Sequence, residues 1–447
     1  MKKIFLIMTA FFFSVNIISA QELVTIQQAV NAAIKNNPNV SILEENINIQ
    51  KQNKRTVTGD LIPNLNFSAG WSRNNTFSKG TTVYQNGIPF VLGDQTTAKS
   101  NYSLGLNSQV VLFDGFANYR KLDLSDQNIE ASVLQLEKTK YDIMMDITQK
   151  YFDVLRKDRI VYINQDNLKT SVDQLDKIKV YVEVGKKTIS EVYKQDVQVA
   201  QDELDLESSI RQLEKSKVDL LNAMNDDVNK EITVEVKDVN LDMTLGDLFN
   251  IMNKYDRIDD LVKSALSKRY DYLLGIQNIK IYETQFNIAK KYLYYPSLSA
   301  FGTFNVSGNQ YDEIFNTRVF TFGLNLSYPI FQGFKLDVNS QIAEINIKQK
   351  NEDLRNITQQ LKADIKKSVI DLQTAYKQIE ILERNITAAE QDVILSEENY
   401  RVGYGTLLDM QVAVTRLNNL RIERVNAIYN FFLAQRQIDY LSGNLKY

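Results

Sequence analysis

One stretch, Val319 to Asp409, joins a pattern typical of a membrane β-strand to a pattern typical of a very long helix. From Phe320 to Tyr328 apolar and polar residues alternate, and this period of two predicts a strand with one apolar and one polar face. The strand is predicted to end between Pro329 and Gly333. From Phe334 to about Val402 there is no proline and apolar residues recur at helical spacing, which predicts a single helix.

The predicted helix ends at Gly403 and Gly405, and a second helical pattern begins near Thr406. An earlier stretch, residues 101–191, has the same layout of strand, long helix, glycine turn and new helix. A strand that feeds directly into a rod of this length is an unusual pairing, and its occurring twice indicates a repeated unit.

The spacing of the glycines supports an internal duplication. Gly115 and Gly333 are 218 positions apart, and so are Gly185 and Gly403. Before each strand pair, a Pro-containing pentapeptide marks the change from helical to alternating period, Leu61–Leu65 in the first half and Tyr294–Leu298 in the second. We therefore interpret residues 21–230 and 231–447 as two structural repeats, with a mixed segment at about 226–256.

Each repeat is predicted to contain helices, then two strands, then a long helix and a return helix. In the first repeat we expect helices at 27–36 and 40–59, strands at 65–72 and 102–110, an exposed loop at 73–99, and helices at 117–184 and 190–225. In the second we expect one helix at 257–293, strands at 297–307 and 319–328 around a shorter loop, and helices at 334–402 and from 406 onward. Between the repeats, Ile232 to Val236 suggests a short strand and Leu245 to Tyr255 a short helix.

Composition excludes several classes of function. The 447 residues include no Cys and no His, which removes thiol nucleophiles, disulfides, His-based triads and His metal ligands. Carboxylate-only chemistry remains possible on composition alone. Because the sequence shows no triad, metal cluster or phosphate loop, we expect no enzyme activity, no catalytic residue, no cofactor and no metal site. The net charge of −3 and the lack of a basic block argue against a nucleic-acid partner.

The N-terminus has the layout of a signal peptide. Lys2 and Lys3 precede a short apolar run that ends at Ser19-Ala20, so we expect residues 1–20 to be removed, which takes the net charge from −3 to −5. The alternative is an N-terminal membrane anchor. No later segment has about 18 consecutive apolar residues, so an exported chain of this kind is periplasmic, secreted, or part of an outer-membrane β-barrel.

Four predicted strands are too few to close a barrel in a membrane. An open strand edge in hydrocarbon leaves backbone groups unpaired, and about eight strands is the usual minimum. Two copies of the chain would supply eight strands and three copies twelve. A helix of about 68 residues is a rod of about 100 Å without a core of its own, so it must also pack along neighbours. A fibrous or surface-anchored coiled-coil protein would explain the rods, but not two strand pairs at the same end of each unit.

The order of elements resembles the TolC-like outer-membrane efflux proteins over essentially the whole mature chain. The most specific segments are Tyr328–Gly333 and Tyr400–Asp409. The resemblance implies a membrane α+β fold in which three chains form a 12-stranded β-barrel continued by an α-helical coiled-coil tunnel. It also implies an outer-membrane location extending into the periplasm, contact with outer-membrane lipid, and a homotrimer that works with a periplasmic adaptor and an inner-membrane pump in efflux or type I secretion.

The resemblance also suggests residues for a periplasmic gate. Acidic residues that ring the tunnel mouth in the family match Glu191 and Asp409, and Tyr400 matches an aromatic residue that hydrogen-bonds there. The alternatives are helix-start carboxylates favoured by the helix dipole and a buried core tyrosine. Two positions depart from the family: a second acidic position falls on Val412 and a basic one on Gly405, so we expect a differently held gate.

Two further groups of residues are candidates. The turns are expected to contact the adaptor's helical hairpin, although the same glycines act as helix C-caps in any case; their residues are Gly185, Thr188, Gly403, Gly405 and Thr406. Aromatic residues of the strands are candidates for the membrane interfaces, namely Trp71, Tyr102, Phe320 and Tyr328.

Overall fold

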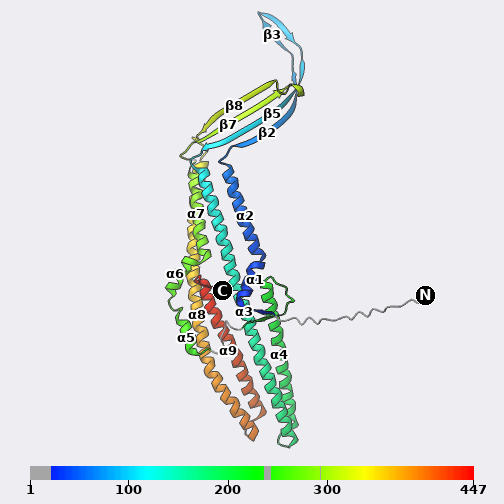
Figure 1. The fold of residues 1–447 in the computed structure, drawn as a ribbon, viewed down its shortest axis with the longest axis vertical. Helices are drawn as coiled ribbons and strands as arrows, with labels where there is room; N and C mark the ends of the chain where they lie inside the picture. The colour runs from blue at the N-terminus through cyan, green and yellow to red at the C-terminus, as the bar shows by residue number, and fades with distance from the viewer. Residues whose placement is uncertain (1–21, 236–242, 292) are drawn as a thin grey trace, which may run out of the picture. The chain divides into compact units, whose positions relative to one another are not determined.

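A computed structural model describes residues 22–235, 243–291 and 293–447, and Figure 1 shows the order of their elements. The predicted signal peptide, residues 1–20, lies outside the described residues, as do residues 236–242 of the segment between the repeats. The chain divides into two compact units. Unit 1 comprises Met1–Val40, Lys138–Arg269 and Gln360–Tyr447, and unit 2 comprises Ser41–Glu137 and Tyr270–Gln359. Each unit thus draws on both halves of the sequence.

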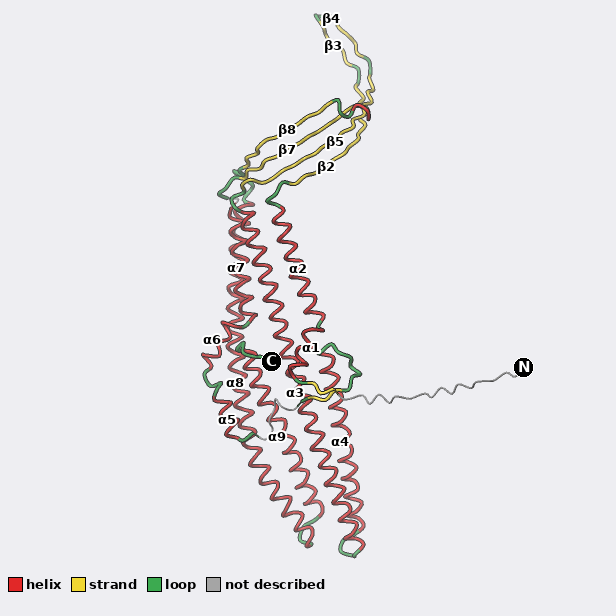
Figure 2. Tube along the Cα trace, viewed as in Figure 1, coloured by secondary structure: helices red, strands yellow, loops and turns green. Residues whose placement is uncertain are grey.

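Unit 2 is built on a four-stranded antiparallel sheet in the order β2-β5-β7-β8, with β2 and β8 at its edges (Figure 2). The strands are β2 (Asn64–Ser78), β5 (Gln95–Phe113), β7 (Ser297–Gly308) and β8 (Thr317–Ser327). A 3-10 turn, η1 (Tyr311–Glu313), connects β7 to β8. The four strands predicted by the alternation of residues are therefore present, and both edges of the sheet are free in a single chain.

The prediction of a loop over residues 73–99 is wrong. Strand β2 continues to Ser78, and β3 (Thr81–Gln85) and β4 (Ile88–Leu92) form a further hairpin before β5 begins. Asn86 and Gly87 connect them with φ of 53° and 86°. Two successive positive φ values define the tight hairpin turn for which Asn-Gly is the preferred sequence. The strands on either side are too short to establish a period of two, which is why the pattern did not reveal them.

Each strand pair joins its long helix through the same backbone turn. Phe116 and Phe334 both have a positive φ, 63° and 66°, which is uncommon for an aromatic residue. The helix α3 (Ala117–Glu183) then begins under a cap in which Asn118 N–H donates to both Asp114 oxygens at 3.0 and 3.3 Å. Lys291 at the end of α7 (Tyr270–Lys291) donates to Asp114 Oδ2 at 3.3 Å; the Lys291 side chain is buried and that of Asp114 is 12% exposed.

Unit 1 contains the main hydrophobic core. Its buried residues come from α1 (Ile26–Asn36), from β1 (Glu22–Val24) and β6 (Ile232–Val234), which pair in parallel, and from the long helices. The hydroxyl of fully buried Tyr151 lies 3.0 and 2.8 Å from the carbonyl oxygens of Val24 and Glu235, which share its single proton, and it accepts from Glu235 N–H at 3.0 Å. This hydroxyl therefore joins α3 to the small sheet.

The helices of the two halves follow one order. The first half has α1, α2 (Pro38–Gly59), α3 and α4 (Ile189–Ala223); the second has α6 (Ile258–Lys268), α7, α8 (Lys335–Val402) and α9 (Leu407–Leu441). A short helix, α5 (Leu245–Asn253), lies between them. Among the residues described, no helix is both long and apolar enough to cross a membrane.

The prediction of a single helix over residues 257–293 is wrong, because α6 and α7 are separated at Arg269. Arg269 has extended backbone, with ψ of 124°, and is 7% exposed. Its guanidinium donates to the Tyr440 carbonyl at 3.3 Å and lies 4.4 Å from the centre of the Tyr440 ring. This break is created by contacts with a distant part of the sequence, and no Pro or Gly marks it.

Candidate functional site

Two helix–turn–helix ends of unit 1 carry the predicted gate residues. The helices α3 and α4 meet at Gly185, and α8 and α9 meet at Gly403, with φ of 76° and 90°. The backbone hydrogen bonds of the two turns are equivalent. Lys186 N–H donates to the Tyr181 carbonyl at 2.8 Å, and Tyr404 N–H donates to the Asn399 carbonyl at 2.9 Å. Glycine with positive φ at this position is the usual C-cap of a helix that ends in a tight turn.

The return helices begin differently in the two turns. Thr406 and Asp409 form a capping box: Asp409 N–H donates to Thr406 Oγ1 at 3.2 Å, and the Thr406 hydroxyl and N–H donate to Asp409 Oδ2 at 2.6 and 3.0 Å. These bonds hold the pKa of the Asp409 carboxyl below its usual range. Thr188 makes no side-chain cap bond to α4. Glu191, the corresponding carboxylate, is therefore available for another partner.

That partner is Tyr400, on the last turn of α8. Its hydroxyl donates to Glu191 Oε2 at 2.5 Å, so one side-chain bond joins the two turns. Burial and the Glu191 carboxylate raise the pKa of Tyr400 above its usual value. Lys187 makes the same connection a second time, because its ammonium donates to the Tyr400 carbonyl at 3.0 Å and lies 3.7 Å from the ring centre. The family resemblance suggested Tyr400 and Glu191, but Lys187 was not predicted.

An apolar cluster supports this contact. Tyr400 is 4% exposed and packs with Ile178, Leu407 and Met410, against which Val192 is partly buried. The cluster draws on α3, α4, α8 and α9. The ring of Tyr400 is thus a core side chain, while its hydroxyl makes a hydrogen bond to Glu191.

A buried polar layer lies about one turn of α4 beyond Glu191. Fully buried Gln195 donates to the carbonyl and the hydroxyl of Ser171, each at 3.0 Å, and accepts from Gln411 Nε2 at 3.0 Å. This layer joins α3, α4 and α9. The sequence analysis did not predict this layer. A signal existed, because the position 218 residues after Gln195 is occupied by the apolar residue Ala413. In the structure both residues are buried.

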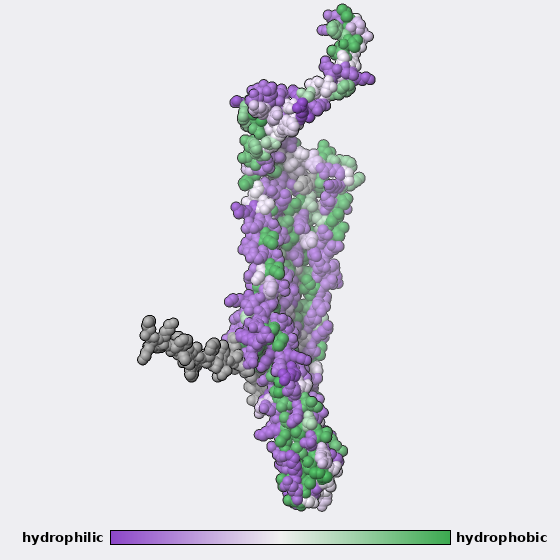
Figure 3. Space-filling model, turned by 90° about the vertical axis from the view of Figure 1, so that its right-hand side faces the viewer, coloured by the Kyte–Doolittle hydropathy of each residue, from purple (hydrophilic) through white to green (hydrophobic). Residues whose placement is uncertain are grey.

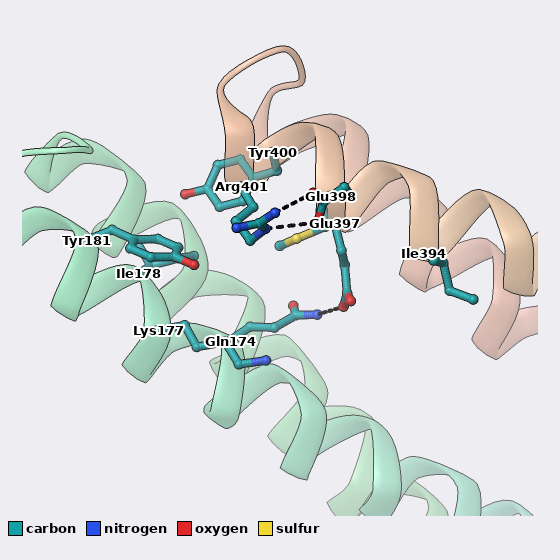
Figure 4. A pocket seen from close by; sticks show the side chains of 10 residues that line it. Gln174, Lys177, Ile178, Tyr181, Ile394, Glu397, Glu398, Tyr400 and Arg401 are labelled. Atoms are coloured by element: carbon teal, nitrogen blue, oxygen red, sulfur yellow. Dashed lines mark hydrogen bonds and ion pairs between the residues drawn. The ribbon is translucent and has the colours of Figure 1, made fainter.

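A cavity of about 340 Å³ lies between α3 and α8 beside Tyr400 (Figure 4). Buried Ile178 and Met410 line it together with the charged residues Lys177, Glu398 and Arg401. Across it, Gln174 Nε2 donates to Glu397 Oε1 at 3.2 Å, and on α8 itself Arg401 donates to Glu398 (Figure 4). Tyr400, Gln174 and Gln195 each join the α3–α4 hairpin to the α8–α9 hairpin.

The surface of the turns is partly apolar. Val184 and Val402, which directly precede the two glycines, are 61% and 50% exposed. Figure 3 shows hydrophobic side chains over these helix ends on the face that it draws. The two positions that depart from the family pattern also lie here: Val412 is 47% exposed, and a Cβ on Gly405 would come within 3.1 Å of Asn399 Cβ.

The predicted interface aromatics all lie in unit 2. Trp71 and Tyr102 are directly opposite each other on β2 and β5, with ring centres 6.4 Å apart. Phe320 lies on edge strand β8, 69% exposed, and Tyr328 follows the end of that strand. Within the described part of the chain no group of His, Cys, Asp or Glu residues is arranged to hold a metal ion.

The sequence matches a family described as "Outer membrane efflux protein" over residues 29–226 and 261–444. A curated relative, "Outer membrane protein TolC" from Vibrio cholerae serotype O1, is 22% identical over 396 residues, which cover 86% of this chain and 83% of the relative. A second protein of that name, from Escherichia coli strain K12, is 30% identical over 151 residues, which cover 33% of this chain and 30% of the relative.

Solved structures have the same fold. A structure of CusC, described in terms of its folding and transmembrane channel formation, has a TM-score of 0.77 at 14% identity and covers 95% of this chain and 93% of its own. The CmeC outer membrane channel of Campylobacter jejuni has a TM-score of 0.74 at 15% identity, covering 94% of this chain and 85% of its own. The fold predicted for the chain is thus that of known outer-membrane channels with a helical extension.

Proposed function

The chain belongs to the outer membrane efflux protein family, and from this premise we propose that three copies form the exit duct of a tripartite efflux or type I secretion system. Membership makes the chain an outer-membrane channel protein that extends into the periplasm, and not an enzyme. In this proposal three chains close one barrel, the periplasmic end of the duct is gated, and the channel works with a periplasmic adaptor and an inner-membrane pump.

The free edges of the sheet carry the proposal. Strands β2 and β8 each pair on one side only, and the part of the chain that the structure describes has no further strand on either edge. Their apolar side chains are exposed, with Phe67 and Leu324 both 67% exposed. In a bilayer each unpaired backbone group at such an edge costs several kcal/mol, so the edges must be paired by other copies. Three copies give a barrel of twelve strands, which the family resemblance favours over eight.

We propose that residues 21–230 and 231–447 are two repeats that each supply one strand pair and one helical hairpin. The hairpins α3–α4 and α8–α9 would then enclose the periplasmic end of the duct. The bonds of Tyr400 to Glu191 and of Lys187 to Tyr400 hold the two hairpins of one chain together. Opening of the duct requires these hairpins to separate or tilt, so the same bonds favour a closed end.

Three copies would place three Glu191 and three Asp409 carboxylates around that end. A ring of carboxylates in a pore attracts cations, and multivalent cations that bind the ring block the pore. The low pKa of Asp409 keeps its carboxyl charged at neutral pH. We propose that the exposed turns, with Val184 and Val402 beside the glycines, contact the adaptor, since apolar side chains at a coiled-coil end can bind a partner helix.

Reconstitution of the full chain tests the channel. In fractionated cells the protein should be found in the outer membrane, and its extraction should require detergent. The purified protein should have the mass of a trimer by light scattering and should conduct ions in a planar lipid bilayer. Export of a reporter substrate should depend on it in cells that carry an adaptor and a pump. A stable, water-soluble oligomer without conductance would contradict the proposal and favour a structural coiled-coil protein.

A further inference from the structure

The two strand pairs of unit 2 have the same register when the chain is compared with itself. In the first pair Asn64 lies opposite Gln109, and in the second Ser297 lies opposite Ser327. Asn64 and Ser297 each directly follow the proline of the matching pentapeptides, 233 positions apart. Gln109 and Ser327 are 218 positions apart, the separation of the glycines. Two separations found in the sequence thus reproduce the observed pairing residue for residue.

The structure also shows how one repeat pairs with the next. Strand β5 ends the first pair and β7 begins the second, and they are joined with Ser108 opposite Gly302 and Leu106 opposite Phe304. If copies of the chain close a barrel, β8 of one copy must pair with β2 of the next, because these are the free edges (Figure 2). This junction is again the end of one repeat meeting the start of another.

We propose that β8 pairs with β2 of a neighbouring copy in the register of the β5–β7 junction. Applying the two separations to that junction places Leu326 opposite Ala69, Leu324 opposite Trp71 and Ser327 opposite Ser68. The inference rests on the proposed function, because it needs copies that share a barrel. It specifies which backbone and side-chain groups of this chain form the contact.

Two features that did not enter the derivation agree with this register. Near Ser68 the register places Trp71 and Ala69 opposite Leu324 and Leu326, whereas towards Ser78 Arg73 and Asn75 fall opposite Phe322 and Phe320. A shift by one residue would put the apolar face of β2 beside the polar face of β8, with Ala69 opposite Asn325 or Ser327. The strand ends also coincide, since Thr317, the first residue of β8, falls opposite Ser78, the last residue of β2. All eleven residues of β8 would then be paired.

The proposed pairing of β8 with β2 also has a structural reason to stop near Ser327, the last residue of β8. In the β5–β7 junction the register shifts between Val111 and Phe113. Val111, the last residue paired before this shift, corresponds to Pro329, which has no N–H to donate to a neighbouring strand. Strand β8 ends two residues before Pro329, at Ser327. The inter-copy ladder is therefore expected to run from Ser78 down to Ser68 on β2 and to stop there.

Cysteine cross-linking tests the register directly, because the chain has no Cys of its own. The full-length double variant Ser68→Cys, Ser327→Cys places two thiols opposite each other, and both substitutions change one atom of a small side chain. Directly opposite residues have Cβ atoms about 4.5–5.5 Å apart, against about 7–8 Å for diagonal neighbours. Within one copy these residues lie on opposite edges of the sheet, so a disulfide between them must join two chains.

Two control variants place their two cysteines on the same face of the sheet but in different registers. Ser68→Cys with Asn325→Cys is displaced by two residues in one direction, and Ser72→Cys with Asn325→Cys in the other. After oxidation of membranes with copper phenanthroline, non-reducing gels should show most of the Ser68/Ser327 variant as cross-linked dimers and trimers. Each control should give at least fivefold less, and each single variant none.

Preferential cross-linking of either control would overturn the register, and so would the absence of cross-links from all three variants when the protein is still a conducting trimer. Light scattering and bilayer conductance of the same preparations keep these results separate from a failure of the proposed function. If no variant cross-links and the wild-type chain is neither trimeric nor conducting, both proposals are wrong.

Discussion

The hydroxyl of Tyr400 and the carboxylate of Glu191 are 2.5 Å apart, in a hydrogen bond that joins the ends of two helical hairpins 209 positions apart in the sequence. The bond connects two helical hairpins whose turns have equivalent backbone hydrogen bonds, but the position equivalent to Tyr400 in the α3–α4 hairpin is Val182, which has no hydroxyl to bond to Asp409. The residue that corresponds to Glu191 is Asp409, which caps its own helix instead. The two turns of one chain are therefore chemically different, and substitutions at equivalent positions should have different effects.

Replacing Tyr400 with Phe removes the hydroxyl and keeps the buried ring. We expect the channel to open more readily, because the bond to Glu191 that favours contact between the hairpins is lost. In planar bilayers the single-channel conductance or the open fraction should rise by about twofold or more, as expected for losing a charge-assisted bond. Tyr404→Phe is the matched control, since Tyr404 is 91% exposed on the same turn. Equal conductance in both variants would show that the bond does not restrain the channel.

Replacing Thr406 with Ala should loosen the start of α9. The substitution removes a capping box, and loss of an N-cap of this kind costs about 1 kcal/mol. We expect faster hydrogen–deuterium exchange in a peptide covering residues 403–412. Thr188→Ala at the corresponding position of α4 should change exchange little, because Thr188 makes no side-chain cap bond. Similar effects from the two substitutions would contradict the structural difference between the turns.

The same pair predicts a dependence on pH. The Asp409 carboxyl has a pKa below its usual value because Thr406 donates hydrogen bonds to it. Its contribution to local stability is therefore fully present above the ordinary value of about 3.9 and is lost as the pH falls through the lower value of the folded state. The difference in exchange between wild type and Thr406→Ala should be constant from pH 8 to about pH 5. It should shrink only in stronger acid; a loss already at pH 6 would exclude Asp409 as the cause.

Much of the fold was predictable because it depends on local periodicity. The four strands follow an alternation of apolar and polar residues, and the ends of α3 and α8 follow from Gly185 and Gly403. The features that were missed depend on other signals. The Asn86-Gly87 turn is a two-residue signal between strands too short to show a period, and the break at Arg269 exists because of contacts with Tyr440.

The candidate site was predictable only in part. The resemblance located Tyr400 and Glu191, but their bond depends on how two distant hairpins pack, and no local pattern encodes that distance. Lys187 and Gln195 were missed because a Lys in a turn and a Gln in a helix are ordinary residues for a solvated surface. Their roles arise from burial and from partners on other helices, Tyr400 for Lys187 and Ser171 with Gln411 for Gln195.

Replacing Gln195 with Ala should weaken the contact between the hairpins. The variant leaves Gln411 and Ser171 without their buried partner, and an unsatisfied buried polar group costs about 1–3 kcal/mol. We expect exchange of the α4 amides near residue 195 to be about tenfold faster. Gln201→Ala is the control, because Gln201 is exposed and bonds to Asp205 on its own helix. Protection equal to that of the control would mean that the polar layer adds no stability.

Removing both carboxylates of the turns tests the proposed ring. The double variant Glu191→Ala, Asp409→Ala should have a higher conductance or a weaker block by multivalent cations such as hexaamminecobalt, because a trimer would lose six negative charges from one constriction. A smaller effect is expected from each single variant. The control double variant Glu203→Ala, Asp219→Ala removes the same charge from exposed positions further along α4. Block that is unchanged in Glu191→Ala, Asp409→Ala but weakened in the control variant would contradict the proposed ring. The constriction would then lie further along α4 than the turns, and Glu191 would serve only to bind Tyr400.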